Sequence, residues 1–413
     1  MPAGQVQTAG VRSSRTRWAA PGLIGLVFAV CVARYAWMIR RHVVDVLFWD
    51  QWDFLQPVFD GEPLWASFRW QHGSHRQGLG GVVLALLYPA SGFSNRAEAW
   101  VALGLFALAA LAFLWVIARV GRGLTFEDAC VPAMVLTLSA WEAFGGTQNL
   151  AYGPFPLAFL GGLALAQLVE RRPLRWGLTA LLGALATHSA FAVAWTPLVP
   201  LLLALELRAP LTAQERAGLG AAVALSTLAI VSVFVGYRHA DEQDVVSGAL
   251  SQPFALLRFA ALMLAHPWGI AGTRGALRVP LALVIFAAVC ALQLWSLRRL
   301  WATRAAEVTA RLVWLLAGSS LAYALLAAPG RVGLGLELAS SSRYVSHMVP
   351  AMIAVWLALR TLRPVPIVRL ALVSICLLVC AKEVLKVRAI EVELSKLSDA
   401  KRAFVACELA SHD

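Results

Sequence analysis

Long apolar stretches separated by short polar segments run through most of the 413-residue chain. Each stretch approaches the roughly 20 residues that an α-helix needs to cross the hydrocarbon core of a membrane. The period-2 alternation of a membrane β-barrel is missing, so the pattern predicts an all-α, polytopic transmembrane bundle. We expect about eleven spans, at residues 21–38, 99–117, 129–144, 152–168, 176–188, 191–205, 217–236, 279–295, 312–328, 345–359 and 366–381.

Whether two further apolar pieces, residues 79–93 and 253–265, cross the membrane is decided by the parity of the number of spans. If neither spans and the N-terminus is cytoplasmic, every basic cluster between spans falls on the cytoplasmic side, as the positive-inside rule demands. Counting 79–93 as a span would place the next clusters outside. We therefore expect both pieces to be interfacial or re-entrant helices on the outer face. The clusters are Arg119/Arg122, Arg171/Arg172/Arg175, Arg208/Arg216, Arg298/Arg299/Arg304/Arg311 and Arg360/Arg363/Arg369.

This topology divides the chain into a transmembrane domain, residues 1–381, and a short helical tail on the outer face, residues 382–413. The first outer loop, residues 40–93, is the longest polar region. The outer face would also carry segments 146–149, 237–278 and 329–343. We expect a multi-pass protein of the plasma (inner) membrane, with its N-terminus in the cytoplasm and its C-terminus outside.

The amino-acid composition supports a membrane protein and argues against a soluble domain and a nucleic-acid-binding protein. Hydrophobic residues make up 60% of the chain, charged residues only 14%, and the mean hydropathy is +0.70. A soluble domain of this size would need more charge. The net charge of +12 comes mostly from arginine clusters between spans, so we expect contact with membrane lipids and no nucleic-acid partner. The six cysteines follow no spacing that indicates a disulfide framework or a metal site.

The densest polar cluster lies at residues 48–54 (FWDQWDF), soon after the first span. Asp50 and Asp53 are three residues apart and would share one side of a helical turn. A carboxylate among apolar rings has its charged form disfavoured, which suits a general base. Alternatively, the aromatic residues form an interfacial belt and the two carboxylates simply face water.

A second cluster lies at residues 71–76 (QHGSHR). His75 and Arg76, together with His72, could hold a phosphate through charge-assisted hydrogen bonds at the level of the lipid headgroups. The i, i+3 spacing of the two histidines could instead contribute to a metal site, but no third ligand is near in sequence, so no metal ligands are assigned. An ordinary hydrated loop is the remaining interpretation.

Polar residues at the outer ends of later spans complete the candidate set. Glu142 lies near the end of the third span, where a carboxylate is costly unless it has a function or reaches the interface. Gln148 follows in the turn 145–148 (GGTQ). Arg343 opens the tenth span against both the positive-inside bias and the helix dipole, which an anionic partner would explain. Arg331 in the same loop could assist.

These motifs, in this order, resemble those of the GT-C superfamily of multi-span glycosyltransferases, which use polyprenyl-phosphate-linked sugars. The resemblance rests on four short pieces: DQWD at 50–53, the His75-Arg76 pair before an apolar helix, GTQ at 146–148 and SRY at 342–344. It is most similar to uncharacterised bacterial members with an Asp-x-Trp-x-Phe-Leu motif, here residues 50–55, and a downstream His-Arg. The architecture covers most of the chain, but the specific residues are only these few.

The resemblance implies a site as well as a fold. A carboxylate of the first outer loop would be the base that acts on the acceptor; this is Asp50, with Asp53 as the competing choice. Many members have two adjacent acids, whereas Gln51 follows Asp50 here, so Asp53 or Glu142 would supply the second. Arg343, with His75 and Arg76, would hold the lipid phosphate as the leaving group. The donor would be a polyprenyl-phosphate sugar and the acceptor a cell-envelope glycan, lipid or protein.

The mechanism implied is a single displacement with inversion, and a requirement for a divalent cation (Mg²⁺ or Mn²⁺) is left open. The first alternative is a transporter or flippase of lipid-linked glycans, which predicts charges at mid-membrane and broken spans. The second is an enzyme resembling O-antigen ligases or polymerases, whose basic residues tend to lie in a late loop. The concentration of polar residues on one face favours an enzyme over both alternatives.

Overall fold

The computed structural model describes residues 14–73, 75–145, 150–238, 251–270, 276–361 and 365–412. Helices make up nearly all of the regular structure in these ranges, and the sheet found there is one short antiparallel hairpin of β1 (Gln71–His72) and β2 (His75–Arg76). In this hairpin Gln71 pairs with Arg76 and His72 with His75. The prediction of an all-α fold is confirmed.

The helices follow the predicted apolar pattern closely. In the first half of the chain they are α1 (Ser14–His42), α2 (Asp50–Phe54), α3 (Gln56–Phe59), α4 (Leu64–Arg69), α5 (Leu79–Ala90), α6 (Asn95–Val120), η1 (Phe126–Ala129), α7 (Cys130–Val135), η2 (Leu138–Ala140), α8 (Glu142–Gly145), α9 (Pro154–Ala166), α10 (Arg172–Thr187), η3 (Ala190–Ala194) and α11 (Leu198–Glu206). In the second half they are α12 (Ala213–Val233), α14 (Pro253–Ala265), η4 (His266–Trp268), α15 (Arg278–Thr303), α16 (Val308–Ala327), η6 (Val332–Leu334), η7 (Leu336–Ser340), η8 (Ser342–Tyr344), α17 (Val345–Thr361) and α18 (Pro366–His412).

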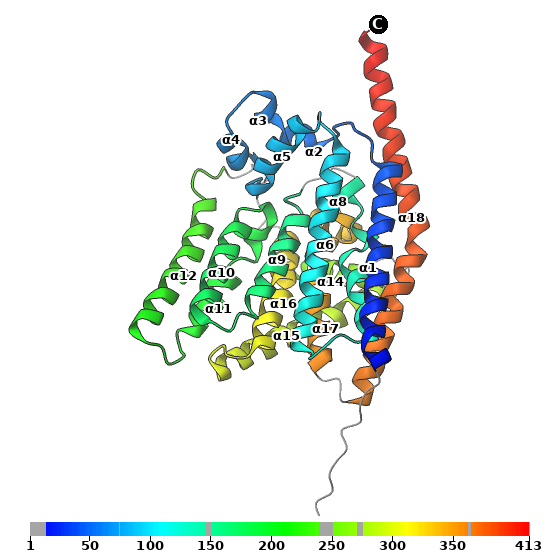
Figure 1. Ribbon diagram of the computed structural model, residues 1–413. Helices are drawn as coiled ribbons and strands as arrows, with labels where there is room; N and C mark the ends of the chain where they lie inside the picture. Colours follow the sequence, from blue (N-terminus) through cyan, green and yellow to red (C-terminus); the bar gives the residue numbers. More distant parts are fainter. Residues whose placement is uncertain are drawn as a thin grey trace, which may run out of the picture.

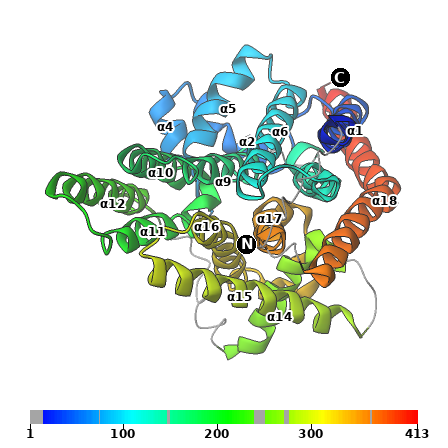
Figure 2. The ribbon, with the colours of Figure 1, turned by 60° about the horizontal axis from the view of Figure 1, so that its bottom comes forward.

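Among the residues that the structure describes, five helices are long and apolar enough to cross a membrane: Ala19–His42 within α1, α6, α12, α15 and α16. The chain is therefore a membrane protein by the length and composition of its helices. The other predicted spans correspond to shorter helices, to broken ones such as α7–η2–α8, and to α18, which carries charges beside its apolar part. The number of eleven spans stays a prediction. Helices α16 and α17 lie at the centre, with the others around them (Figure 2).

The polar segments between helices gather at the two ends of the bundle. At one end, which we call the loop end, α2–α5 lie together (Figure 1). Contacts join the predicted outer segments there: the Arg238 N–H donates to Gln71 Oε1 at 3.0 Å, and Arg278 Nη1 donates to Glu337 Oε1 at 2.9 Å. These predicted outer segments therefore lie at the same end of the helical bundle, as expected from the parity of the number of spans.

The arginine clusters meet at the opposite end. Arg311 Nη2 donates to the carbonyl of Gln167 at 2.9 Å, and Arg360 Nη2 donates to the carbonyl of Gly123 at 2.8 Å. Both interactions join segments that are far apart in sequence. The predicted separation of basic clusters from the polar loops is thus confirmed, because each set occupies its own end of the bundle.

Helix α14 is the apolar piece that we expected to be interfacial or re-entrant. Its residues 259–265 are all almost completely buried, and it packs against α15, α16 and α17. Only its first turns are exposed, as at Phe254. An interfacial helix needs one polar face, which residues 259–265 lack, so the burial excludes the interfacial position for this half and fits the re-entrant one. Helix α5, by contrast, lies at the loop end as expected (Figure 1).

Helix α18 joins the eleventh predicted span and the predicted tail into one helix without a break at residue 381. It contacts the second half of α1, at Arg34, Arg41 and His42, and continues past the bundle at the loop end (Figure 1). There the Ser398 hydroxyl donates to the carbonyl of His42 at 2.5 Å, and Lys401 Nζ lies 5.9 Å from the centre of the Phe48 ring. The tail therefore packs against the first outer loop.

A buried group of charges connects α18 to α1 and to the break between α7 and η2. Arg34 Nη2 lies 2.9 Å from Glu383 Oε2, which also accepts the backbone N–H of Leu138 at 3.1 Å. Glu383 Oε1 accepts from the Thr137 hydroxyl at 2.5 Å and lies 3.0 Å from Lys382 Nζ. The carboxylate thus satisfies polar groups that the interrupted helix leaves open.

Candidate active site

The acidic turn, residues 48–54, directs two carboxylates toward one histidine. Helix α2 begins at Asp50, directly after Trp49, whose φ of 52° turns the chain sharply. The predicted sharing of one side by Asp50 and Asp53 is confirmed, and Gln51 is buried on another side. His72 Nδ1 lies 2.5 Å from Asp53 Oδ2, and His72 Nε2 lies 3.8 Å from Asp50 Oδ2. His72 therefore joins the two acids.

A buried polar network holds the acidic turn in place. Gln51 Nε2 donates to the Tyr88 hydroxyl oxygen at 3.0 Å and to Asn95 Oδ1 at 2.8 Å. The Tyr88 hydroxyl donates to Glu98 Oε2 at 2.5 Å, and Glu98 Oε1 accepts the backbone N–H of Leu150 at 3.1 Å. Gln51, where a second acid was expected from the resemblance, thus fixes the turn to α5, α6 and the segment before α9.

Replacing Gln51 with leucine should lower the free energy of unfolding by about 1–3 kcal/mol, because Tyr88 and Asn95 would lose a buried hydrogen-bond partner. Thermal unfolding of the detergent-purified protein measures this. Gln56→Leu is the matched control, since Gln56 is exposed and its amide bonds to Asp60 at the surface. Equal losses in the two variants would contradict the role given to Gln51.

His75 lies on the hairpin beside the acidic turn. Its side chain is buried, and its Nε2 is 2.8 Å from the hydroxyl oxygen of Tyr152. Burial, followed by the charges of His72 and Arg331, lowers the pKa of His75 to about 3. The imidazole is therefore neutral at physiological pH. His75 supplies no positive charge to a phosphate, in contrast to the charge-assisted role that we expected for it.

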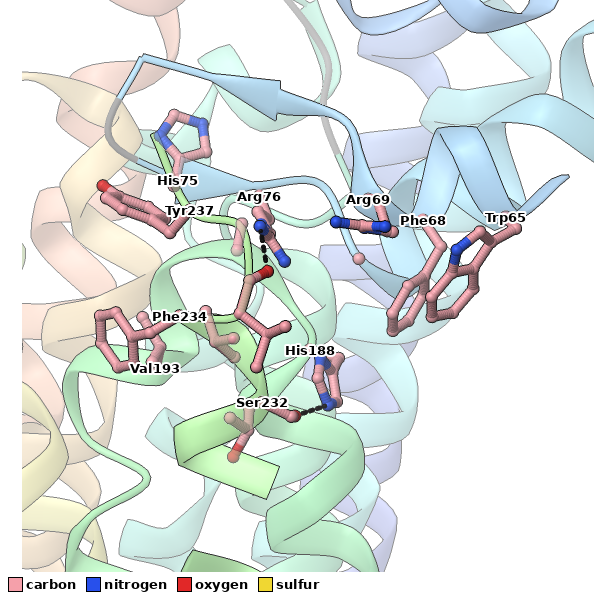
Figure 3. A pocket seen from close by; sticks show the side chains of 15 residues that line it. Trp65, Phe68, Arg69, His75, Arg76, His188, Val193, Ser232, Phe234 and Tyr237 are labelled. Carbon is pink, nitrogen blue, oxygen red and sulfur yellow. Dashed lines mark hydrogen bonds between the residues drawn. The ribbon is translucent and has the colours of Figure 1, made fainter. Parts of the chain in front are cut away.

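Arg76, the second residue of the predicted phosphate-binding pair, contacts other residues than His75 does. Successive side chains on a strand point to opposite faces. Arg76 Nη2 donates to the carbonyl of Val235 at 2.7 Å, just past the end of α12, and lines a pocket there (Figure 3). Arg76 thus reaches toward α12 across this pocket, and the buried His75 also lines the pocket but bonds to Tyr152.

Arg343 and Glu142 form an ion pair at the start of α17. Glu142 Oε2 accepts the backbone N–H of Arg343 at 2.9 Å and the Ser341 hydroxyl at 3.1 Å, and it also accepts the Ser342 hydroxyl. Glu142 Oε1 lies 3.4 Å from Arg343 Nη2. The start of α17 tolerates a cation because this carboxylate is beside it. Glu142 is therefore a partner of Arg343 inside the protein.

Arg343 keeps its charge and part of its exposure. Burial has the largest single effect and lowers the pKa of Arg343, but the Glu142 carboxylate, with Tyr344 and Asp50, raises it, so the net shift is upward. The Arg343 side chain is still 37% exposed, against 18% for Glu142. The guanidinium is therefore a permanent cation with donors that a ligand can reach.

Asp50 and Arg343 share an electrostatic partner, the buried side chain of Tyr152. Asp50 and Arg343 both interact electrostatically with this buried side chain and with each other. Each also has a partner of its own, His72 for Asp50 and Glu142 for Arg343. The acid and the cation, from distant parts of the chain, thus both act electrostatically on the same tyrosine.

Aromatic side chains surround Tyr152. The Phe191 ring lies 5.0 Å from the Tyr152 ring and 5.8 Å from the Tyr323 ring, and Tyr323 stacks on His347 with centroids 3.8 Å apart. Sequence reasoning missed all four residues. Tyr152, Phe191 and Tyr323 look like ordinary core positions, but an ionisable His347 inside an apolar span was a usable signal.

Most predicted site residues are brought together. Arg331 joins the group through electrostatic interactions with His75 and Tyr344. Gln148 lies outside the residues that the structure describes. Asp50, Asp53, His75 and Arg343 interact with Tyr152, Glu142 joins them through Arg343, and Arg331 joins them through His75.

The ranges that the structure describes contain no group of three or more His, Cys, Asp or Glu residues placed to hold a metal ion. Asp53 is engaged with His72, and Glu142 with the start of α17. These carboxylates do not fit a cage for Mg²⁺ or Mn²⁺ in this arrangement, since such ions need several free oxygen ligands. We derive no step through a divalent cation.

No protein-family model, no curated protein and no solved structure matches this chain. The resemblance to the GT-C superfamily therefore rests on the short motifs, on their order and on the helical architecture. Function has to be argued from the chemistry of the residues around Tyr152.

Proposed function

We propose that the protein is a membrane glycosyltransferase that moves a sugar from a polyprenyl-phosphate carrier to an acceptor at the loop end. The observation that carries this proposal is that Asp50 and the partly exposed Arg343, from distant parts of the chain, interact electrostatically with each other and with Tyr152. A base for the acceptor and a cation for the departing phosphate are the two groups that this transfer needs. In the same proposal the bundle has eleven spans and the loop end faces away from the cytoplasm.

The proposed reaction is a single displacement. A hydroxyl oxygen of the acceptor attacks the anomeric carbon of the donor sugar while the Asp50 carboxylate takes the hydroxyl proton. The bond from the anomeric carbon to the phosphate oxygen breaks, and its electron pair stays on the lipid phosphate. Arg343 stabilises that developing charge. The products are the glycosylated acceptor, with inverted anomeric configuration, and the free polyprenyl phosphate.

Asp50 is a better candidate for the base than Asp53. Asp53 is engaged at 2.5 Å by His72 and at 3.4 Å by the indole N–H of Trp70. Asp50 is only 3.8 Å from His72 and interacts with Arg343. A carboxylate with fewer fixed partners can accept a proton at lower cost. Asp53 then serves to orient His72 beside the base.

The test is an assay of sugar release from polyprenyl-phosphate-linked hexoses and pentoses by the purified protein in liposomes, with cell-envelope membranes as the acceptor source. Arg343→Ala should lower the rate about 100-fold, because one preformed group that stabilises the leaving charge is lost. Arg402→Ala is the control, since Arg402 is an exposed cation that pairs with Asp399 on α18. A wild-type rate in Arg343→Ala would refute the role of Arg343.

A lipid-linked-glycan transporter is the second candidate, and the buried charges beside the break between α7 and η2 are the observation that favours it. Those charges are paired with one another and with backbone groups, which suits a structural connection between helices. The same liposome experiment separates the two functions. A transporter would move the lipid-linked sugar across the bilayer intact, whereas a transferase would separate the sugar from the lipid.

A further inference from the structure

A pocket of about 430 Å³ lies beside the residues around Tyr152. Its walls come from α4, the hairpin, the turn between α10 and η3, and the end of α12. Figure 3 shows Arg69 and Arg76 close together near the hairpin, with His188, from the turn after α10, beside Ser232 of α12. Among these residues the sequence predicted a phosphate-binding role only for His75 and Arg76, and it did not predict a pocket.

Two guanidinium groups converge in this pocket. A Cβ atom built on Gly236 would lie 2.8 Å from Arg69 Nη2 and 3.8 Å from Arg76 Nη2, so both groups reach the same glycine. The buried Nε of Arg76 has no hydrogen-bond partner in the described structure. No acidic side chain is among the described lining residues. Two like charges held together without a carboxylate repel each other, and a bound anion would relieve that repulsion.

Apolar side chains line another part of the pocket, next to the end of α12, a helix long enough to cross a membrane. Phe68, Phe234, Val193 and Val235 line the pocket, and Phe234 and Val235 are exposed. They directly follow α12, which is one of the five helices able to cross a membrane. Exposed aromatic and aliphatic side chains at that level are suited to lipid chains, while arginines at a helix end are suited to headgroups.

The polar pair in the pocket does not form a nucleophile. The Ser232 hydroxyl donates its hydrogen to the carbonyl of Ala229 at 2.7 Å. His188 Nε2, 3.2 Å from the same oxygen, must then donate to it, so the imidazole cannot take a proton from Ser232. The pocket is therefore suited to binding and not to covalent catalysis.

We propose that this pocket holds an anionic lipid, with its phosphate between Arg69 and Arg76 and one of its chains along the apolar wall that Phe68 and Phe234 form. The lipid could come from two sources with the same chemistry: a phospholipid of the bilayer or a polyprenyl phosphate. The second source rests on the proposed function, because His75 lines this pocket and also bonds to Tyr152. A polyprenyl phosphate here would lie next to the residues that face Tyr152.

Native mass spectrometry of the full-length protein, titrated with defined lipids, tests the proposal. The probes are polyprenyl phosphate and phosphatidylglycerol, each compared with its phosphate-free counterpart, polyprenol and diacylglycerol. Wild-type protein should bind at least one phosphate lipid, and Arg69→Gln/Arg76→Gln should bind it about tenfold more weakly or less, because charge-assisted hydrogen bonds are lost. Tighter binding of polyprenyl phosphate than of phosphatidylglycerol would identify the carrier lipid; equal binding would identify a general phosphate-lipid site.

The matched control is Arg119→Gln/Arg122→Gln at the opposite end, where Arg119 lies 4.9 Å over Trp115 much as Arg69 lies 6.0 Å over Trp65. It should bind lipid as the wild type does. Arg69→Gln alone covers the case in which the double variant does not fold, because Arg69 is exposed. Equal binding of phosphate-free lipids, or no loss in either arginine variant, would overturn the proposal. Lipid binding is independent of sugar transfer, so a negative transfer assay with phosphate-selective binding would refute only the proposed function.

Discussion

Replacing Asp50 with asparagine should lower the rate of sugar transfer by about 10²–10⁴-fold, the usual contribution of a general base. Asparagine keeps the shape of the side chain but cannot accept the proton of the acceptor. Asp50 begins α2 with a side chain 39% exposed, so the fold should tolerate the change. The loss should appear in kcat, with little change in the KM of the lipid-linked donor, because the carboxylate acts on the acceptor.

The liposome assay of sugar release measures this effect at matched protein levels. Asp60→Asn is the control, because Asp60 ends the neighbouring helix α3, is exposed and bonds to Gln56. Asp53→Asn should have a smaller effect, since Asp53 acts by orienting His72. If Asp53→Asn removed activity while Asp50→Asn retained it, the roles of the two acids would have to be exchanged. If both variants had wild-type rates, the acidic turn would have no catalytic role.

Replacing Glu383 with leucine should lower the free energy of unfolding by about 3–5 kcal/mol, because Arg34 and Lys382 would be left buried without their carboxylate. The backbone N–H of Leu138 would also lose its acceptor at the break between α7 and η2. Thermal unfolding in detergent, monitored by the loss of a compact species, measures the effect.

The same helix provides the control for this prediction. Glu391 pairs with Arg41 at 3.6 Å in a more exposed position, and exposed pairs contribute about 0–1 kcal/mol, so Glu391→Leu should change little. The double variant Arg34→Met/Glu383→Met should recover part of the lost stability, because it removes the Arg34 charge as well, while Lys382 keeps its hydrogen bond to the carbonyl of Pro267. A small effect of Glu383→Leu together with no recovery would show that this group does not hold α18 to the bundle.

The acidic turn shows which features of the site can be predicted from the local sequence. Its position after the first span and the i, i+3 spacing of Asp50 and Asp53 follow from the order of residues alone, and the structure bears both out. The partner of these acids could not be derived in the same way. His72 reaches them because a glycine-containing hairpin returns the chain to α2, and that approach depends on the packing of the whole first loop.

Charged residues were harder to interpret from sequence. Arg343 looked misplaced at the start of a span, and an external anion was the natural explanation. The structure places Glu142 beside it, a carboxylate two hundred residues earlier in the chain. The same limit applies to His75 and Arg76, which are neighbours in sequence. Strand alternation and burial make one a neutral partner of Tyr152 and the other part of a pocket beside α12.

The sequence by itself determined that the chain is an all-α membrane protein, with polar loops at one end and arginine clusters at the other. These properties follow from apolar length and charge order, which act locally and along the chain. Only the tertiary structure decided that α14 is buried, that α18 is one long helix against α1, and that Arg69 joins Arg76 in a pocket. It also brought Asp50 and Arg343 near the same tyrosine, although a short sequence motif had already singled out Asp50. Contacts between such distant segments depend on how the helices pack.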